Sequence, residues 1–259
     1  EKFRRVSFRD AGELSNEMLA EELENSRQVL CIVNSRRAAQ EIYDMLPKEG
    51  SYHLSTLMYP AHRQRVLNEI RQRLKEGAVC RVLSTSLIEA GVDVDFPTVY
   101  REMAGLDSIL QAAGRCNREG RRSSAESTVT IFKSEHKSHS LIGSNIGAAN
   151  EALAGRADPA LPETITKYFS SLRDIIGDGT DKAEVVKKFE RGISGCMMPF
   201  DSVAQGFHMI DNNTKTVYIP LEEGAAIAEK LKSGFATREV YRKAGRYGVN
   251  AYDIQYRRL

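Results

Sequence analysis

Apolar positions follow two alternating periods along the first half of the chain. Short continuous apolar runs, of which VLCIV at 29–33 is the clearest, are typical of strands buried on both faces of a sheet. Most of these runs are followed by a stretch with apolar residues every three or four positions, which predicts an amphipathic helix. The strands predicted in this way cover 29–33, 52–55, 80–85, 98–103 and 127–132, and the helices cover 35–46, 61–77 and 108–116. This alternation predicts an α/β fold, with a parallel sheet covered by helices on both faces.

The pattern changes after Phe132. A polar stretch at 133–140 leads to segments with helical spacing, and alternating runs around Asn212 and Asn213 predict a β-hairpin over 207–220. The helices predicted in this half cover 141–156, 163–177, 183–192, 222–234 and 237–245. We therefore expect three parts, which are an α/β lobe at 1–135, a helical linker at 136–196 and the start of a small α+β accessory domain at 197–259.

Composition narrows the classes of function. The 259 residues include 37 Lys or Arg and 35 Asp or Glu, so the formal charge is only +2. This balance excludes a strongly basic protein that coats nucleic acid, but not a local basic groove. Apolar runs stay short of the roughly 20 residues that a membrane span needs, and the charged first residues argue against a signal peptide. We therefore expect a cytoplasmic protein with no membrane partner. Four widely spaced cysteines without a C-x-x-C pair predict reduced thiols and no metal site.

Polar clusters follow the predicted strands, at the edge where parallel sheets bind ligands. The most distinctive cluster is QAAGRCNREG at 111–120. Gln111, Arg115 and Arg118 are spaced by four and three residues, so on a helix they would share one face. Two arginines can neutralise the charge on a phosphoryl group during its transfer. The alternative is a helix end whose arginines pair with surface acids.

A second cluster, STSLIEAGVDVD at 84–95, also follows a buried strand. Hydroxyl and backbone N–H groups at Thr85 would open a helical turn, which suits a phosphate. After the return through Gly91, the carboxylate of Asp93 could bind a ribose hydroxyl or an arginine. The alternative is an ordinary helix cap at Ser86.

Two weaker clusters follow the strands before it. In VNSRR at 33–37, Ser35 and Arg36 could hold a backbone phosphate, or Ser35 could simply cap the next helix. Thr56 lies just past the end of the strand at 52–55.

Together these clusters resemble the second RecA-like lobe of superfamily 2 helicases. VLCIVNSRRAAQEIYDML resembles motif IV, STSLIEAGVDVD motif V, and QAAGRCNREG the Q-x-x-G-R-x-x-R signature of motif VI. The segments HLSTLMYPAHRQR and PFDSVAQGFHMIDNNTKTVYIP are similar to the CRISPR-associated helicase–nuclease of type I systems, and the resemblance covers nearly the whole chain.

The resemblance implies specific roles for these residues. Arg115 and Arg118 would be the catalytic arginine fingers that reach the γ-phosphate of ATP. Gln111, Gly91 and Asp93 would contact the nucleotide. The residues that would contact the phosphate backbone of one DNA strand are Ser35, Arg36, Thr56 and Thr85.

The chain also departs from the family pattern. It contains no Gly-Lys, Asp-Glu or His-Asp pair, so the phosphate-binding loop, the Mg²⁺ ligands and the nuclease metal centre of the family are missing. The resemblance thus implies half of an ATP-dependent DNA translocase or helicase in CRISPR interference, inactive alone. Its expected partners are single-stranded DNA, an upstream helicase lobe and nuclease domain of the same protein, and a guide-RNA surveillance complex.

Two other interpretations stay open. One is the second lobe of an RNA helicase, which shares motifs V and VI. The other is a non-catalytic docking fragment for a surveillance complex or a regulator. The C-terminal tyrosines could stack on bases, dock on a partner or belong to a core; they are Tyr241, Tyr247, Tyr252 and Tyr256.

Overall fold

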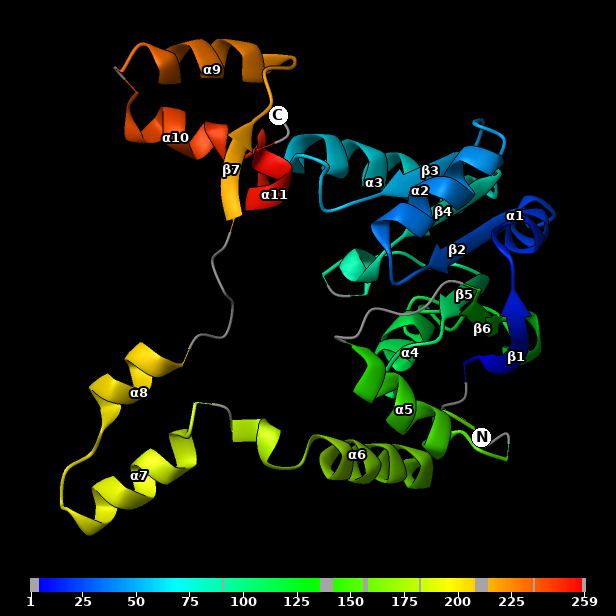
Figure 1. Cartoon of the computed structure of the whole chain (residues 1–259). Helices are drawn as coiled ribbons and strands as arrows, with labels where there is room; N and C mark the ends of the chain where they lie inside the picture. The colour runs from blue at the N-terminus through cyan, green and yellow to red at the C-terminus, as the bar shows by residue number, and fades with distance from the viewer. Residues whose placement is uncertain are drawn as a thin grey trace.

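A computed structural model describes residues 5–89, 91–135, 142–155, 158–181, 183–207, 214–234 and 236–257. Its largest unit is a six-stranded sheet with the order β1-β6-β5-β2-β4-β3, in which every neighbouring pair runs parallel (Figure 1). The strands are β1 (Ser7–Leu14), β2 (Gln28–Ile32), β3 (Ser51–Leu54), β4 (Cys80–Ser84), β5 (Thr98–Glu102) and β6 (Thr128–Ser134). The predicted parallel α/β architecture is confirmed.

Side chains alternate across the central strand and bury two separate cores, one on each face of the sheet. Leu30 and Ile32 of β2 pack with helices α3 (Pro60–Glu76) and α4 (Leu106–Ala113). Val29 and Cys31 point to the opposite face and pack with α1 (Asn16–Glu24) and α2 (Arg36–Met45). The apolar run that forms most of β2 is therefore buried on both faces, as its sequence predicts.

The pattern predicted no element before position 29, yet β1 and α1 lie there. β1 carries exposed charged residues because it is an edge strand, and its backbone pairs with β6 from Ser7 to Leu14. Hydrogen bonding to a neighbouring strand does not require an apolar run, so periodicity alone missed it.

The helices after the lobe fall into two groups. α5 (Gly143–Ala152) and α6 (Pro162–Ile176) bury Ala148, Ala149 and Tyr168 against the lobe. In contrast, α7 (Val185–Ser194) and α8 (Phe200–Gly206) bury none of their described residues. The boundaries expected at 135 and 196 stay predictions.

The C-terminal module consists of β7 (Thr214–Tyr218), α9 (Glu223–Lys232), α10 (Arg238–Ala244), β8 (Gly248–Tyr252) and α11 (Asp253–Tyr256). β7 pairs antiparallel with β8, so the second strand of the predicted hairpin takes a distant partner. This corrects the prediction as far as it can be followed, because 208–213 lie outside the described residues. Val249 and Ala251 of β8 are buried in this arrangement.

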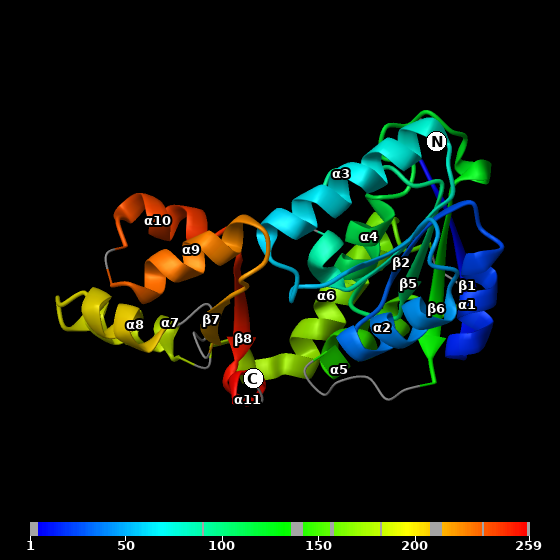
Figure 2. The ribbon, with the colours of Figure 1, turned by 90° about the horizontal axis from the view of Figure 1, so that it is seen from above.

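The module rests on the first turn of α3 (Figures 1 and 2). The rings of Tyr59 and Tyr247 stack with centroids 5.5 Å apart. The Ala61 N–H donates to the Arg246 carbonyl at 2.9 Å, and Arg65 forms an ion pair with Glu222 at 2.6 Å. Apolar, backbone and charged contacts together hold the module beside the carboxyl edge of the sheet.

Candidate functional site

A groove of about 810 Å³ opens at the carboxyl ends of β2, β3 and β4. Residues of the three loops that follow these strands line it, together with Tyr252 of β8. The four residues expected to contact a nucleic-acid backbone all belong to this lining; they are Ser35, Arg36, Thr56 and Thr85.

The register of the sheet explains why these loops meet. Ile32 of β2 and Leu54 of β3 both pair with Ser84 of β4, so the three strands end at one level. The loops that follow the three strands therefore start at the same level of the sheet, and their first polar side chains face the same groove. This convergence follows from the fold and not from any single cluster.

Three polar residues of the groove wall differ in their contacts and in their charge. The Ser35 hydroxyl accepts a hydrogen bond from the Ala38 N–H at 3.4 Å and so caps α2, as the plainer interpretation predicted. Arg37 forms an ion pair with Glu41 at 2.7 Å, and this contact raises the pKa of Arg37. Burial lowers the pKa of His53, whose imidazole is therefore neutral near pH 7.

The arginine cluster of 111–120 is built differently from its prediction. α4 ends at Ala113, so Gln111, Arg115 and Arg118 do not share one helix face. Gly114 caps the helix, and Cys116 beyond it forms a short parallel bridge with Phe96. Gln111 stays exposed on α4.

Arg115 is buried and donates hydrogen bonds to the loop after β4. Its Nε donates to the Ile88 carbonyl at 3.0 Å and its Nη2 to the Glu89 carbonyl at 2.5 Å. Burial lowers the pKa of Arg115, and the nearby charge of Arg118 lowers it further. With its donors on backbone carbonyls, Arg115 holds the loop after β4 against the segment that follows α4.

Arg118 instead lies at the surface. Its Nε is 2.6 Å from Oδ1 of Asp93, and both side chains are substantially exposed. Gly91, two residues before Asp93, has a φ of 71°, a left-handed conformation that glycine adopts without strain. The structure thus joins Arg118 to Asp93, two residues predicted to act at the nucleotide.

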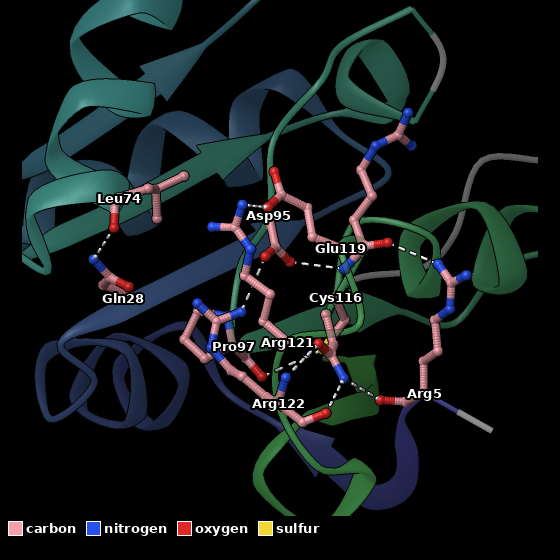
Figure 3. A network of polar contacts seen from close by, with 11 residues as sticks. Arg5, Gln28, Leu74, Asp95, Pro97, Cys116, Glu119, Arg121 and Arg122 are labelled. Atoms are coloured by element: carbon pink, nitrogen blue, oxygen red, sulfur yellow. Dashed lines mark hydrogen bonds and ion pairs between the residues drawn. The ribbon is translucent and has the colours of Figure 1, made fainter. Parts of the chain in front are cut away.

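Two residues that the pattern did not single out shape the Arg118 loop (Figure 3). Asn117, at a φ of 46°, donates through Nδ2 to the carbonyls of Arg5 and Arg122 at 2.8 and 2.7 Å. Asp95 accepts from the Arg118 N–H at 2.7 Å and forms an ion pair with Arg122 at 3.2 Å. The asparagine itself was the sequence signal for a turn at position 117, since asparagine tolerates positive φ better than most residues.

A buried ion pair links the groove to the arginine cluster, and sequence reasoning missed it. Arg101 Nε lies 3.0 Å from Glu89 Oε1, with side chains only 3% and 5% exposed. Arg101 Nη1 also donates to Asn34 Oδ1 at 2.8 Å, and the Asn34 N–H donates to Glu102 at 2.7 Å. Burial raises the pKa of Glu89, while the charge of Arg101 opposes that rise. The sequence signal for a buried ion pair was the presence of two charged residues, Arg101 and Glu102, at the end of an otherwise mostly apolar strand.

The exposed donors at this edge are cationic, so they fit the phosphates of a nucleotide better than a metal ion. The part of the chain that the structure describes contains no group of three or more His, Cys, Asp or Glu side chains placed to hold a metal. Within the same residues, no helix is long and apolar enough to cross a membrane.

Comparisons with known proteins identify the family that the chain resembles. Residues 25–121 match the family model "CRISPR-associated nuclease/helicase Cas3, C-terminal". The chain is 32% identical over 140 residues to the CRISPR-associated nuclease/helicase Cas3 of Methanothermobacter thermautotrophicus, which covers 52% of this chain and 17% of that protein. It is 51% identical over 61 residues to the Haloferax volcanii protein of that name, covering 23% and 6%. Over residues 25–121, this chain is similar to the C-terminal part of Cas3.

The fold agrees with the same family. The crystal structure of T. fusca Cas3-ATP covers 95% of this chain with a TM-score of 0.62 at 15% identity, and this chain covers 36% of that one. The chain therefore spans well under two thirds of its Cas3 relatives. The resemblance to the CRISPR-associated helicase–nucleases and the RecA-like α/β fold are confirmed, whereas the roles of single residues stay predictions.

Proposed function

We propose that the chain is the second motor lobe of a Cas3-type, ATP-dependent translocase or helicase that acts on single-stranded DNA. The observation that carries the proposal is the convergence of Ser35, Arg36, Thr56 and Thr85 on one groove, although they follow three different strands. Hydroxyl, backbone N–H and guanidinium donors bind phosphates without reading bases. A motor that moves along a strand of any sequence needs this kind of contact.

We assign the ATP contact to Arg118 first. When bound, ATP supplies the phosphoryl group whose transfer to water drives movement. The exposed pair of Arg118 with Asp93 can be exchanged for a phosphate, whereas Arg115 is committed to two buried carbonyls. Arg115 then acts as a positioning residue, and Gln111 and Gly91 complete the nucleotide edge. The Mg²⁺ ligands and the phosphate-binding loop belong to a first lobe outside this chain, so we expect the chain alone not to hydrolyse ATP.

The partners of the whole protein belong to the same proposal. They are an upstream helicase lobe and nuclease domain, in line with the name of the matching family, and a guide-RNA surveillance complex, which the sequence resemblance implies. The cytoplasmic location expected from the sequence stays a prediction.

The groove is tested by titrating a fluorescent single-stranded oligonucleotide into the 259-residue chain at several salt concentrations. Arg36→Ala should weaken binding and reduce the slope of log affinity against log salt by about 0.7, the value for one phosphate contact on a single strand. Arg27→Ala is the matched control, because Arg27 is exposed before β2 at the opposite end of the sheet. Equal slopes for the two variants would contradict the proposal.

The same titration separates the alternatives. An RNA helicase lobe should bind oligouridylate more tightly than oligothymidylate. A docking fragment should bind neither strand through the groove, and its interaction would use the exposed apolar side chains of α7, α8 and the turn between them: Val186, Ile193, Met197, Met198 and Phe200.

A further inference from the structure

Tyr252 lines the groove from a distant part of the chain. Among the described residues that line the groove, the others lie between positions 34 and 86, whereas Tyr252 ends β8 of the C-terminal module. It pairs with Thr214 of β7, so it lies at one end of the two-stranded sheet. The groove is therefore bounded by two units, with the phosphate-binding candidates on one and an aromatic ring on the other.

The ring is carried by an anchored strand. Along β8 the side chains of Val249 and Ala251 are buried, and the alternate positions, including Tyr252, face outward. Directly before β8, Tyr247 stacks on Tyr59 of the lobe. Directly after it, Asp253 forms an ion pair with Lys215 at 3.1 Å. Contacts on both sides thus fix where the backbone presents the Tyr252 ring.

The two walls of the groove match the two halves of a nucleotide. Arg36 and the hydroxyls of Thr56 and Thr85 suit a phosphate, and a ring that is 54% exposed suits the face of a base. Only an unpaired base offers its face in this way, so the geometry favours a single strand over a duplex.

We propose that Tyr252 stacks on a base of the single strand whose phosphates lie along Ser35, Arg36, Thr56 and Thr85. This inference rests on the proposed nucleic-acid groove and adds the group that binds the base. It also gives the C-terminal module a function, since the strand is held between module and lobe. Stacking is tolerant of sequence because every base has a π-face, so it suits a motor.

The other C-terminal tyrosines are placed differently. Tyr247 is buried in the contact with the lobe, and Tyr256 lies under the Lys215 ammonium at 4.7 Å. Tyr241 is 57% exposed on α10 and lies outside the described lining of the groove. Its exposure matches that of Tyr252, so Tyr241 is the control residue.

The test compares oligothymidylate with an abasic oligonucleotide of the same length, which has the same phosphates and no bases. Tyr252→Ala in the full chain should lower affinity for oligothymidylate roughly 5- to 100-fold and leave affinity for the abasic strand unchanged. Tyr252→Phe should bind like the parent chain, since stacking needs the ring and not the hydroxyl. Tyr241→Ala should leave both affinities unchanged.

A second readout does not depend on affinity. The sequence contains no tryptophan, so Tyr252→Trp introduces a single one. Its fluorescence should be quenched by oligothymidylate and not by the abasic strand. Absence of quenching by bound oligothymidylate would overturn the stacking proposal even where Tyr252→Ala fails to fold.

The outcomes separate the two proposals. If Arg36→Ala weakens neither strand, the nucleic-acid groove is wrong. If Arg36→Ala weakens both strands but Tyr252→Ala weakens both equally or neither, the groove stands and the stacking by Tyr252 is wrong.

Discussion

Two arginine–carboxylate pairs lie close together in the lobe, and their surroundings differ completely. Arg101 and Glu89 meet at 3.0 Å with side chains 3% and 5% exposed, whereas Arg118 and Asp93 meet at 2.6 Å with side chains 43% and 78% exposed. Water screens the second pair and competes for it, but neither charge of the first pair can be hydrated without opening the core. The same two chemical groups thus form a buried structural ion pair in Arg101 and Glu89, and a solvent-exposed ion pair in Arg118 and Asp93.

The two ion pairs therefore differ in role: the buried pair positions neighbouring residues, and the exposed pair is available to a ligand. The buried pair connects Asn34 at the groove to Glu89, and the Glu89 carbonyl accepts from Arg115. The exposed pair keeps Arg118 at the surface, where we propose that a phosphate takes the place of Asp93. Three variants test this difference, from the largest expected effect to the smallest.

Removal of one partner of the buried pair should have the largest effect. Arg101→Met leaves Glu89 buried without its counter-charge, which should cost about 3–5 kcal/mol in the free energy of unfolding measured with urea. Glu89 adds a pH dependence. Its folded pKa is raised by burial, so its contribution to stability is present at low pH and is lost as the pH rises through that pKa.

Arg101→Met removes the charge that opposes this rise, so the variant should be weakest at neutral pH and recover partly in acid. The double variant Arg101→Met with Glu89→Gln removes both charges and should regain part of the stability. A single variant as unstable in acid as at neutral pH would contradict a buried charge as the cause.

The exposed pair should matter for catalysis instead. In a protein that also carries a phosphate-binding lobe, Arg118→Ala should lower the rate of ATP hydrolysis by about two orders of magnitude and leave single-stranded DNA binding largely intact. The control is Arg121→Ala, since Arg121 is a nearby exposed arginine paired with Glu119 at 2.6 Å. A loss below about threefold for Arg118→Ala would count against an arginine finger.

The smallest effect is expected for Asp93. Asp93→Ala removes the carboxylate of an exposed ion pair, so the free energy of unfolding should change by less than about 1 kcal/mol. Thermal or urea denaturation of Asp93→Ala and Arg101→Met side by side measures the contrast directly. Comparable losses would show that the two pairs do not differ as proposed.

Strong periodicity was enough to locate most elements of the lobe. The run at 29–33 became β2, and the stripe at 61–77 became α3, because burial of apolar side chains dominates where they are regularly spaced. Periodicity missed β1, which is joined to β6 through its backbone. It also missed the partner of β7, because β7 pairs with the distant strand β8 and not with its sequence neighbour.

The candidate site shows the same division. Local residue types and their order identified the loops that follow β2, β3 and β4, and all four predicted backbone-contact residues line one groove. Local spacing misplaced the arginines, since it assumed that α4 continues beyond Ala113. Beyond the end of α4, Cys116 pairs with Phe96 in a bridge that joins residues of different segments.

The alternation of strands and helices and the order of the polar loops were legible in the amino acids, because both depend on neighbours along the chain. The pairing of Arg101 with Glu89, the clasp of Arg115 and the placement of Tyr252 at the groove depend on segments far apart in sequence. Only the packed sheet and the docked module bring those segments within contact distance. Tertiary structure therefore decided which charges are buried, which are exposed and which distant residue lines the groove.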